Sequence, residues 1–118
     1  MIIRTAIRCN AVANKSKILI ATDSKKITKL CKENNFKSIL TSKKCRTGTD
    51  RVFEVSKKIK ANYYINVQGD EPVLNPNDLK IMIKSISKLE NKNKVLLGYS
   101  SFKKKKIMKN KNIHKIVF

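Results

Sequence analysis

The sequence has no tryptophan, few aromatic residues and no long apolar run. Aromatic residues make up 6% of the 118 residues, so the chain lacks the stacked aromatic platform on which many proteins bind single-stranded nucleic acid. No apolar stretch approaches the roughly 20 residues that a membrane-spanning helix needs. The N-terminus also lacks the apolar core and the cleavage site of a signal peptide, so we expect a cytoplasmic protein without a membrane partner.

Paired cysteines are missing as well. The three cysteines, Cys9, Cys31 and Cys45, are an odd number at wide spacing and form no CxxC motif. Structural zinc sites and disulfide frameworks need closer or paired thiols, so we expect reduced cysteines with structural roles. The sequence also contains no GxGxxG, Walker or HExxH motif, which leaves these common signatures of nucleotide and zinc sites unmatched.

Basic residues are present in large excess. Lysine and arginine number 28 against 8 acidic residues, which gives a formal net charge of +20. Such a charge attracts phosphate-bearing ligands and is compatible with a non-enzymatic nucleic-acid-binding domain, which we keep as an alternative. The lysines are nevertheless spread along the whole chain, a pattern typical of a solvated surface. We therefore do not expect nucleic acid as the partner.

Helical and extended patterns alternate along the sequence. Apolar residues recur at helical spacing in 1–16 and in the segments that follow Asp23, Asp50 and Pro76. Five short apolar runs have the length of buried strands: 17–23, 36–42, 62–69, 94–102 and 113–118. The lysine-rich connector before the last run is predicted to be a loop. This alternation predicts one α/β domain with a mainly parallel, doubly wound sheet flanked by helices.

In such a sheet, ligands bind beyond the carboxyl ends of the strands. The segment "QGDE" at 68–71 follows the third predicted strand, and Asp70 there is a hard oxygen ligand suited to Mg²⁺. Gly69 would let the backbone approach a ligand closely. The same acids are equally compatible with a turn in which they accept backbone hydrogen bonds, so the residues alone leave both interpretations open.

Two further segments follow predicted strands. The loop "RTGTDR" is either a glycine-centred turn with Asp50 capping the next helix, or a place where backbone N–H groups and Arg51 face an anionic ligand. For Thr22 and Asp23, a capping role is favoured over a site, with Asp23 or Ser24 as the residue that begins the helix.

Three motifs in this order, "ATD" at 21–23, "TGTDR" at 47–51 and "NVQGDEP" at 66–72, resemble those of the CMP-KDO synthetases. This family is also called 3-deoxy-manno-octulosonate (KDO) cytidylyltransferases, and the resemblance is sharpest over residues 18–79. It implies a Rossmann-like nucleotidyltransferase fold. It also implies transfer of CMP from CTP to KDO, with release of pyrophosphate, for lipopolysaccharide biosynthesis. The related acylneuraminate cytidylyltransferases share the fold, so another sugar acid remains an alternative substrate.

The resemblance also implies roles for single residues. It makes Asp70 the catalytic residue that holds Mg²⁺, and it places Gln68 and Arg51 near the sugar acid. Thr47, Gly48 and Thr49 would lie by the nucleotide. Full-length members of the family would form homodimers.

The resemblance has gaps at both ends of the chain. The family's first strand and its triphosphate-binding loop have no counterpart before residue 1, and its second half has none after residue 118. We therefore expect residues 1–118 to form a single partial cytidylyltransferase domain, a fragment without turnover of its own.

Overall fold

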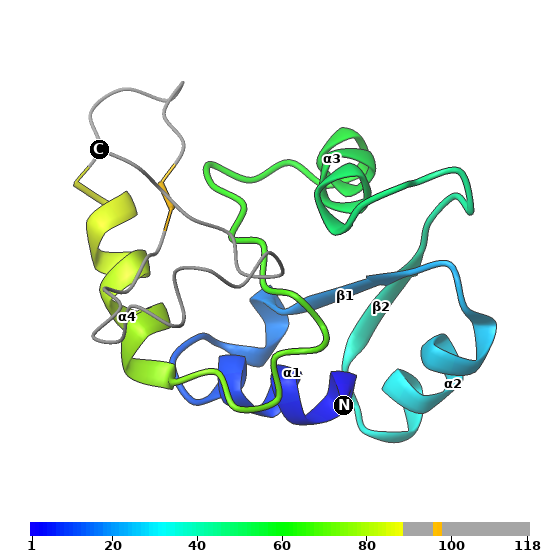
Figure 1. Ribbon diagram of the computed structural model, residues 1–118, viewed down its shortest axis with the longest axis horizontal. Helices are drawn as coiled ribbons and strands as arrows, with labels where there is room; N and C mark the ends of the chain where they lie inside the picture. The colour runs from blue at the N-terminus through cyan, green and yellow to red at the C-terminus, as the bar shows by residue number, and fades with distance from the viewer. Residues whose placement is uncertain (89–95, 98–118) are drawn as a thin grey trace, which may run out of the picture.

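The structure, a computed structural model, describes residues 1–88 and 96–97. Figure 1 shows its elements, which follow one another in this order: α1 (Ile2–Asn10), the 3₁₀ helix η1 (Lys15–Lys17), β1 (Leu19–Thr22), α2 (Lys25–Glu33), β2 (Lys37–Leu40), α3 (Gly48–Lys58) and α4 (Pro76–Ile86). The strands predicted at 94–102 and 113–118, and the loop between them, lie outside the described residues apart from 96–97.

β1 and β2 form a parallel pair, with Leu19 opposite Lys37 and Thr22 opposite Leu40. The backbone N–H of Thr41 donates to the carbonyl of Thr22 at 2.8 Å, one step beyond the paired strands. Helix α2 makes the crossover between them, and α3 contacts β1 from the other side of the strands in Figure 1. The parallel pair with flanking helices confirms the predicted α/β class.

The core lies where α1, β1 and α2 meet. Ala6, Ile20, Cys31 and Phe36 are buried there, and isoleucines from α1, from α2 and from the residue just before β1 pack around them. The Cys31 side chain is 0% exposed, and burial raises the pKa of its thiol. All three cysteines are free thiols, and Cys31 has the structural role expected from the sequence.

Helix α2 begins and ends by local rules. The side chain of Ser24 accepts the backbone N–H of Ile27, so Ser24 rather than Asp23 is the cap. At the other end, Asn35 has a φ of 57°, a left-handed conformation that asparagine tolerates better than most residues. The N–H of Phe36 then donates to the carbonyl of Cys31 at 2.9 Å, which turns the chain into β2 with Phe36 in the core.

Helix α1 differs from its prediction, whereas α4 agrees with it. The helix predicted for 1–16 is shorter than expected: α1 ends at Asn10, and Asn14 caps η1 by accepting the N–H of Ser16. In α4, Asn75 is the cap and Pro76 lies in the first turn, as predicted. None of the described helices has the length and apolar character needed to cross a membrane.

The strand predicted at 62–69 is wrong. Within the described residues the sheet contains β1 and β2 alone, and the chain from 60 to 68 runs without regular secondary structure. A cleft of about 950 Å³ is lined both by residues 18–21, in and next to β1, and by residues 63–70. A strand needs a neighbouring backbone to complete its ladder, so an apolar pattern without that neighbour leaves the segment irregular.

Candidate functional site

The cleft beside β1 brings the predicted site residues together. Five of the six line it: Thr47, Gly48, Arg51, Gln68 and Asp70. The sixth, Thr49, accepts a hydrogen bond from the Asn66 side-chain amide at 3.4 Å. The motifs at 47–51 and 66–72 therefore lie close to one another, although 14 residues of chain separate them.

The first motif forms the beginning of α3. The Thr47 hydroxyl accepts the Asp50 N–H at 3.1 Å, and Asp50 Oδ2 accepts the N–H groups of Thr47 at 2.9 Å and Arg46 at 3.0 Å. These hydrogen bonds, with those to Thr47 as the main cause, lower the pKa of Asp50. The structure corrects the expected cap: Thr47 rather than Asp50 caps α3, which begins at Gly48. Asp50 lies in the first turn of the helix, where it accepts the N–H groups of Arg46 and Thr47.

Arg51 is held by three acceptors. Its Nη2 lies 2.8 Å from Asp23 Oδ2, and its Nη1 donates to Thr41 Oγ1 at 2.9 Å and to the Ser42 carbonyl at 3.3 Å. The hydrogen bond from Arg51 is the main cause that lowers the pKa of Asp23. Arg51 thus lines the cleft as one of the two interpretations from the sequence expected, but it is paired, because it belongs to a network at the strand ends.

Glu54 fastens the loop that precedes α3. It accepts the Ser42 N–H at 2.9 Å, the Cys45 thiol at 3.3 Å and the Lys58 ammonium at 3.0 Å. The Ser42 N–H, as the largest cause, and then Lys58 and Cys45 lower the pKa of Glu54 to about 2. The pKa of Cys45 is raised, chiefly by burial and then by Glu54. Sequence reasoning missed Glu54, because nothing in the local pattern relates it to the loop.

A glycine lets the two motifs touch. A Cβ on Gly48 would lie 2.9 Å from Gln68 Oε1, closer than real Cβ contacts come. The Gln68 side chain therefore lies directly against the first residue of α3 because that residue has no side chain. This contact places the nucleotide-side and sugar-side residues implied by the resemblance beside one another.

Helix α1 anchors the second motif. The hydroxyl of Thr5 is buried and donates to the Gly69 carbonyl at 3.1 Å. A Cβ on Gly69 would lie 2.6 Å from Cδ1 of Ile2, so the loop backbone rests closely on the helix. Sequence reasoning also missed Thr5. The available signal was a hydroxyl on the apolar face of a helix, which needs a partner when it is buried.

Asp70 fits a magnesium ion. Asp70 is exposed and lines the cleft. Within the described part of the chain, its carboxylate forms no hydrogen bond or ion pair. That part of the chain contains no group of three or more histidine, cysteine or acidic side chains that could hold a metal. Mg²⁺ commonly takes one or two carboxylates and completes its shell with water and substrate phosphates, so a single free carboxylate suits it.

Comparison with solved structures defines the class of protein. The structure of CMP:2-keto-3-deoxy-manno-octonic acid synthetase complexed with CTP matches with a TM-score of 0.69 and 32% sequence identity. The match covers 73% of this chain and 36% of that chain. The parallel βαβ unit and the cleft beyond it are therefore part of a Rossmann-like nucleotidyltransferase fold.

Comparison with known sequences defines the family. A family model described as cytidylyltransferase matches residues 1–116, and the chain belongs to this family. A 3-deoxy-manno-octulosonate cytidylyltransferase from Elusimicrobium minutum is 40% identical over 81 residues, which are 69% of this chain and 33% of that protein. The one from Nitratiruptor is 36% identical over 107 residues, 88% of this chain and 43% of that protein. The chain thus spans less than half the length of these curated relatives.

Proposed function

We propose that this protein serves the transfer of CMP from CTP to KDO, with release of pyrophosphate, in the cytoplasm and for lipopolysaccharide synthesis. The observation that carries the proposal is the single cleft into which the two motifs bring Thr47, Gly48, Arg51, Gln68 and Asp70. The names of the relatives and the CTP in the solved neighbour support the choice of substrates.

The nucleotide would lie by the beginning of α3. Thr47 and Gly48 line the cleft there, and Thr49 follows in the first turn of the helix. The first N–H groups of a helix and its dipole favour a ligand with negative charge. This end of the cleft therefore suits the nucleotide, as the resemblance implies for these three residues.

The sugar acid would lie between Arg51 and Gln68. The Arg51 guanidinium suits the carboxylate of the sugar, because its planar fork of N–H groups matches two carboxylate oxygens. The Gln68 amide offers both donors and an acceptor, which suits sugar hydroxyl groups. The contact between Gln68 and Gly48 sets the sugar against the nucleotide end of the cleft.

The chemistry then needs little beyond positioning. A sugar hydroxyl oxygen bonds to the α-phosphorus of CTP, the bond from that phosphorus to the bridging oxygen breaks, pyrophosphate leaves, and the hydroxyl proton passes to water. Bound at Asp70, Mg²⁺ would neutralise charge on the phosphates. Arg51 and Gln68 hold the hydroxyl near the phosphorus, so the gain from these side chains is one of orientation.

Ligand binding and product formation test the proposal separately. CTP, UTP and ATP are titrated with Mg²⁺, followed by KDO and N-acetylneuraminate, and CMP-sugars are sought by mass spectrometry. We expect CTP to bind in preference to UTP and ATP, and KDO in preference to N-acetylneuraminate. Preference for the neuraminate would move the protein to the acylneuraminate branch, and failure to bind either substrate would overturn the proposal.

A further inference from the structure

One guanidinium ties the ends of both strands together. Asp23 comes directly after β1 and Thr41 directly after β2, and Arg51 of α3 binds both, at 2.8 Å and 2.9 Å. The third bond, to the Ser42 carbonyl at 3.3 Å, adds the start of the loop. Thr41 is buried, so its hydroxyl is a fixed acceptor. The position of the Arg51 guanidinium is therefore set by the sheet rather than by its own helix.

The guanidinium keeps donors for a ligand. Of its five N–H groups, Nη1 uses two and Nη2 uses one in the three bonds to described residues. The Nε–H and one Nη2–H remain. The Arg51 side chain is 21% exposed and lines the cleft, and these two N–H groups form no bond to described residues.

Asp23 is the acid that matches the charge of Arg51. Within the described residues it is the carboxylate paired with this guanidinium. The two nearby acids are engaged elsewhere, Asp50 with the N–H groups of residues 46 and 47, and Glu54 with Ser42, Cys45 and Lys58. Asp23 also caps no helix, since Ser24 has that role. The ion pair therefore accounts for Asp23 at this strand end.

We propose that Asp23 is a positioning residue, which fixes the Arg51 guanidinium at the cleft so that its remaining donors bind the carboxylate of the sugar acid. This inference rests on the proposed function. Asp23 acts through Arg51 and touches neither the nucleotide nor the reacting atoms. Substitution of Asp23 should therefore weaken binding of the sugar acid and leave nucleotide binding unchanged.

The binding test uses two substitutions of Asp23. Asp23→Ala removes the acceptor, whereas Asp23→Asn keeps an oxygen that can accept from Nη2. We expect Asp23→Ala to weaken KDO binding about tenfold or more, Asp23→Asn to weaken it less, and both to leave CTP binding within about twofold. Glu33→Gln, at an exposed acid near the end of α2, removes the same charge and should change neither affinity.

A measurement without ligand separates this inference from the proposed function. In ¹⁵N spectra of the Arg51 guanidinium, assigned with Arg51→Lys, we expect the network to slow rotation and to give separate Nη signals in the wild type. The signals should merge in Asp23→Ala. If the wild type binds neither CTP nor KDO, the proposed function fails, and this merging still supports Asp23 as the positioning residue.

Two results would overturn the inference. One is an Asp23→Ala protein that binds KDO as tightly as the wild type, or that loses CTP and KDO by the same factor. The other is a set of Nη signals that are already merged in the wild type, or that stay separate in Asp23→Ala.

Discussion

Gly48 and Gln68 join two motifs through a contact that depends on a missing Cβ. The glycine is the first residue of α3, where alanine would normally favour the helix. In the structure, the Gln68 amide lies against the place where a Cβ of residue 48 would be. The helix therefore favours alanine at position 48, whereas the contact with Gln68 in the cleft requires glycine.

Gly48→Ala tests this opposition. The new Cβ would lie 2.9 Å from Gln68 Oε1 and displace that side chain, whereas the lower conformational entropy of the unfolded chain would stabilise the folded state by about 0.4–1 kcal/mol. We expect KDO affinity to fall several-fold while the free energy of unfolding stays equal or rises, as measured by calorimetric titration and urea denaturation.

A double-mutant cycle controls this prediction. If the substitution acts by moving Gln68, then Gly48→Ala should cost little further KDO affinity in a Gln68→Ala background. Losses that add in the double variant would show that Gly48 acts by another route.

Single residues were predictable from the sequence when their partners are close along the chain. Ser24 caps its own helix and was one of the two caps predicted there, and Pro76 lies in the first turn of the helix that the sequence predicts around it. Thr5 binds a carbonyl 64 residues away, Asp23 an arginine 28 residues away and Glu54 an N–H 12 residues away. Only the fold brings these partners together, so local pattern rules did not find them.

At the scale of elements, α3 and the loop before it are joined by Glu54. The carboxylate lies one turn before Lys58 on the helix and reaches Ser42 and Cys45 in the loop. Because the loop leads into Thr47 and Gly48, its attachment to α3 keeps this end of the cleft in place.

The stability of this attachment should depend on pH. The pKa of Glu54 falls from its ordinary value of 4.5 to about 2, so between these values the folded chain binds fewer protons than the unfolded chain. The contribution of the charged group is complete above the ordinary value and is lost as the pH falls towards 2. In urea, Glu54→Gln should therefore unfold earlier than the wild type near neutral pH, and the gap should close in acid.

Glu33→Gln is the matched control, because this acid is exposed and forms no ion pair in the described residues. The difference in stability to urea between Glu33→Gln and the wild type should stay the same as the pH falls from about 5 to about 2. A gap for Glu54→Gln that stays constant over this range would contradict the role given to its charge.

The elements themselves were predictable to different degrees. Helices α2 and α4 and both paired strands lie where periodicity and caps place them. The segment 62–69 has an equally strong apolar pattern and is no strand, because it pairs with neither β1 nor β2. An apolar pattern reports burial, whereas a strand also needs a paired neighbour, which the segment's own sequence does not encode.

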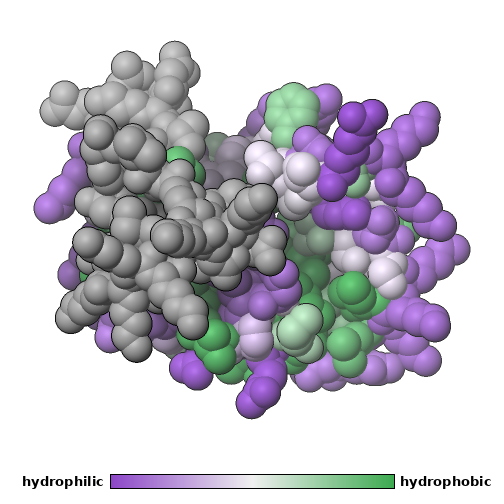
Figure 2. Space-filling model, in the orientation of Figure 1, coloured by the Kyte–Doolittle hydropathy of each residue, from purple (hydrophilic) through white to green (hydrophobic). Residues whose placement is uncertain are grey.

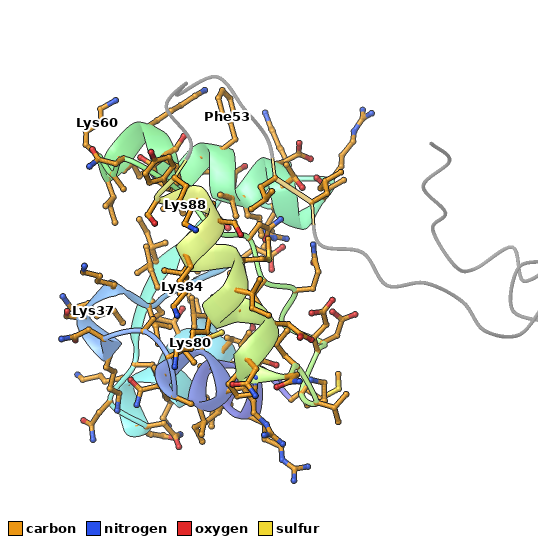
Figure 3. All side chains as sticks on the ribbon, turned by 90° about the vertical axis from the view of Figure 1, so that its left-hand side faces the viewer. Lys37, Phe53, Lys60, Lys80, Lys84 and Lys88 are labelled. Atoms are coloured by element: carbon orange, nitrogen blue, oxygen red, sulfur yellow. The ribbon has the colours of Figure 1, made fainter. Side chains whose placement is uncertain are left out.

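At the scale of the whole molecule, the positive charge is spread over the surface. Figure 2 shows hydrophilic side chains around the rim of one face, with apolar side chains towards its middle. In Figure 3, Lys80 and Lys84 lie along α4 and Lys88 follows just beyond its end, whereas Lys37 and Lys60 lie away from this row. All five are exposed. The described surface thus offers dispersed lysines rather than a groove with stacked aromatic side chains.

This distribution predicts weak binding of nucleic acid. We expect the chain to bind unrelated duplexes with equal affinity, no tighter than about 10⁻⁶ M at physiological salt, because only phosphate charge is recognised. Fluorescence anisotropy over a salt series should show a steep loss of affinity. Sequence-dependent binding well below that concentration would instead favour the nucleic-acid-binding alternative.

The proposed role of Asp70 is to hold Mg²⁺ against CTP in the cleft, and the substitution Asp70→Asn removes the charge on which this role depends. CTP is titrated with Mg²⁺ and with EDTA into the wild type, Asp70→Asn and Asp78→Asn, the same change at an exposed acid on α4. We expect Mg²⁺ to strengthen CTP binding about tenfold in the wild type and in Asp78→Asn, and to have little effect in Asp70→Asn. An equal response to Mg²⁺ in all three proteins would contradict this role.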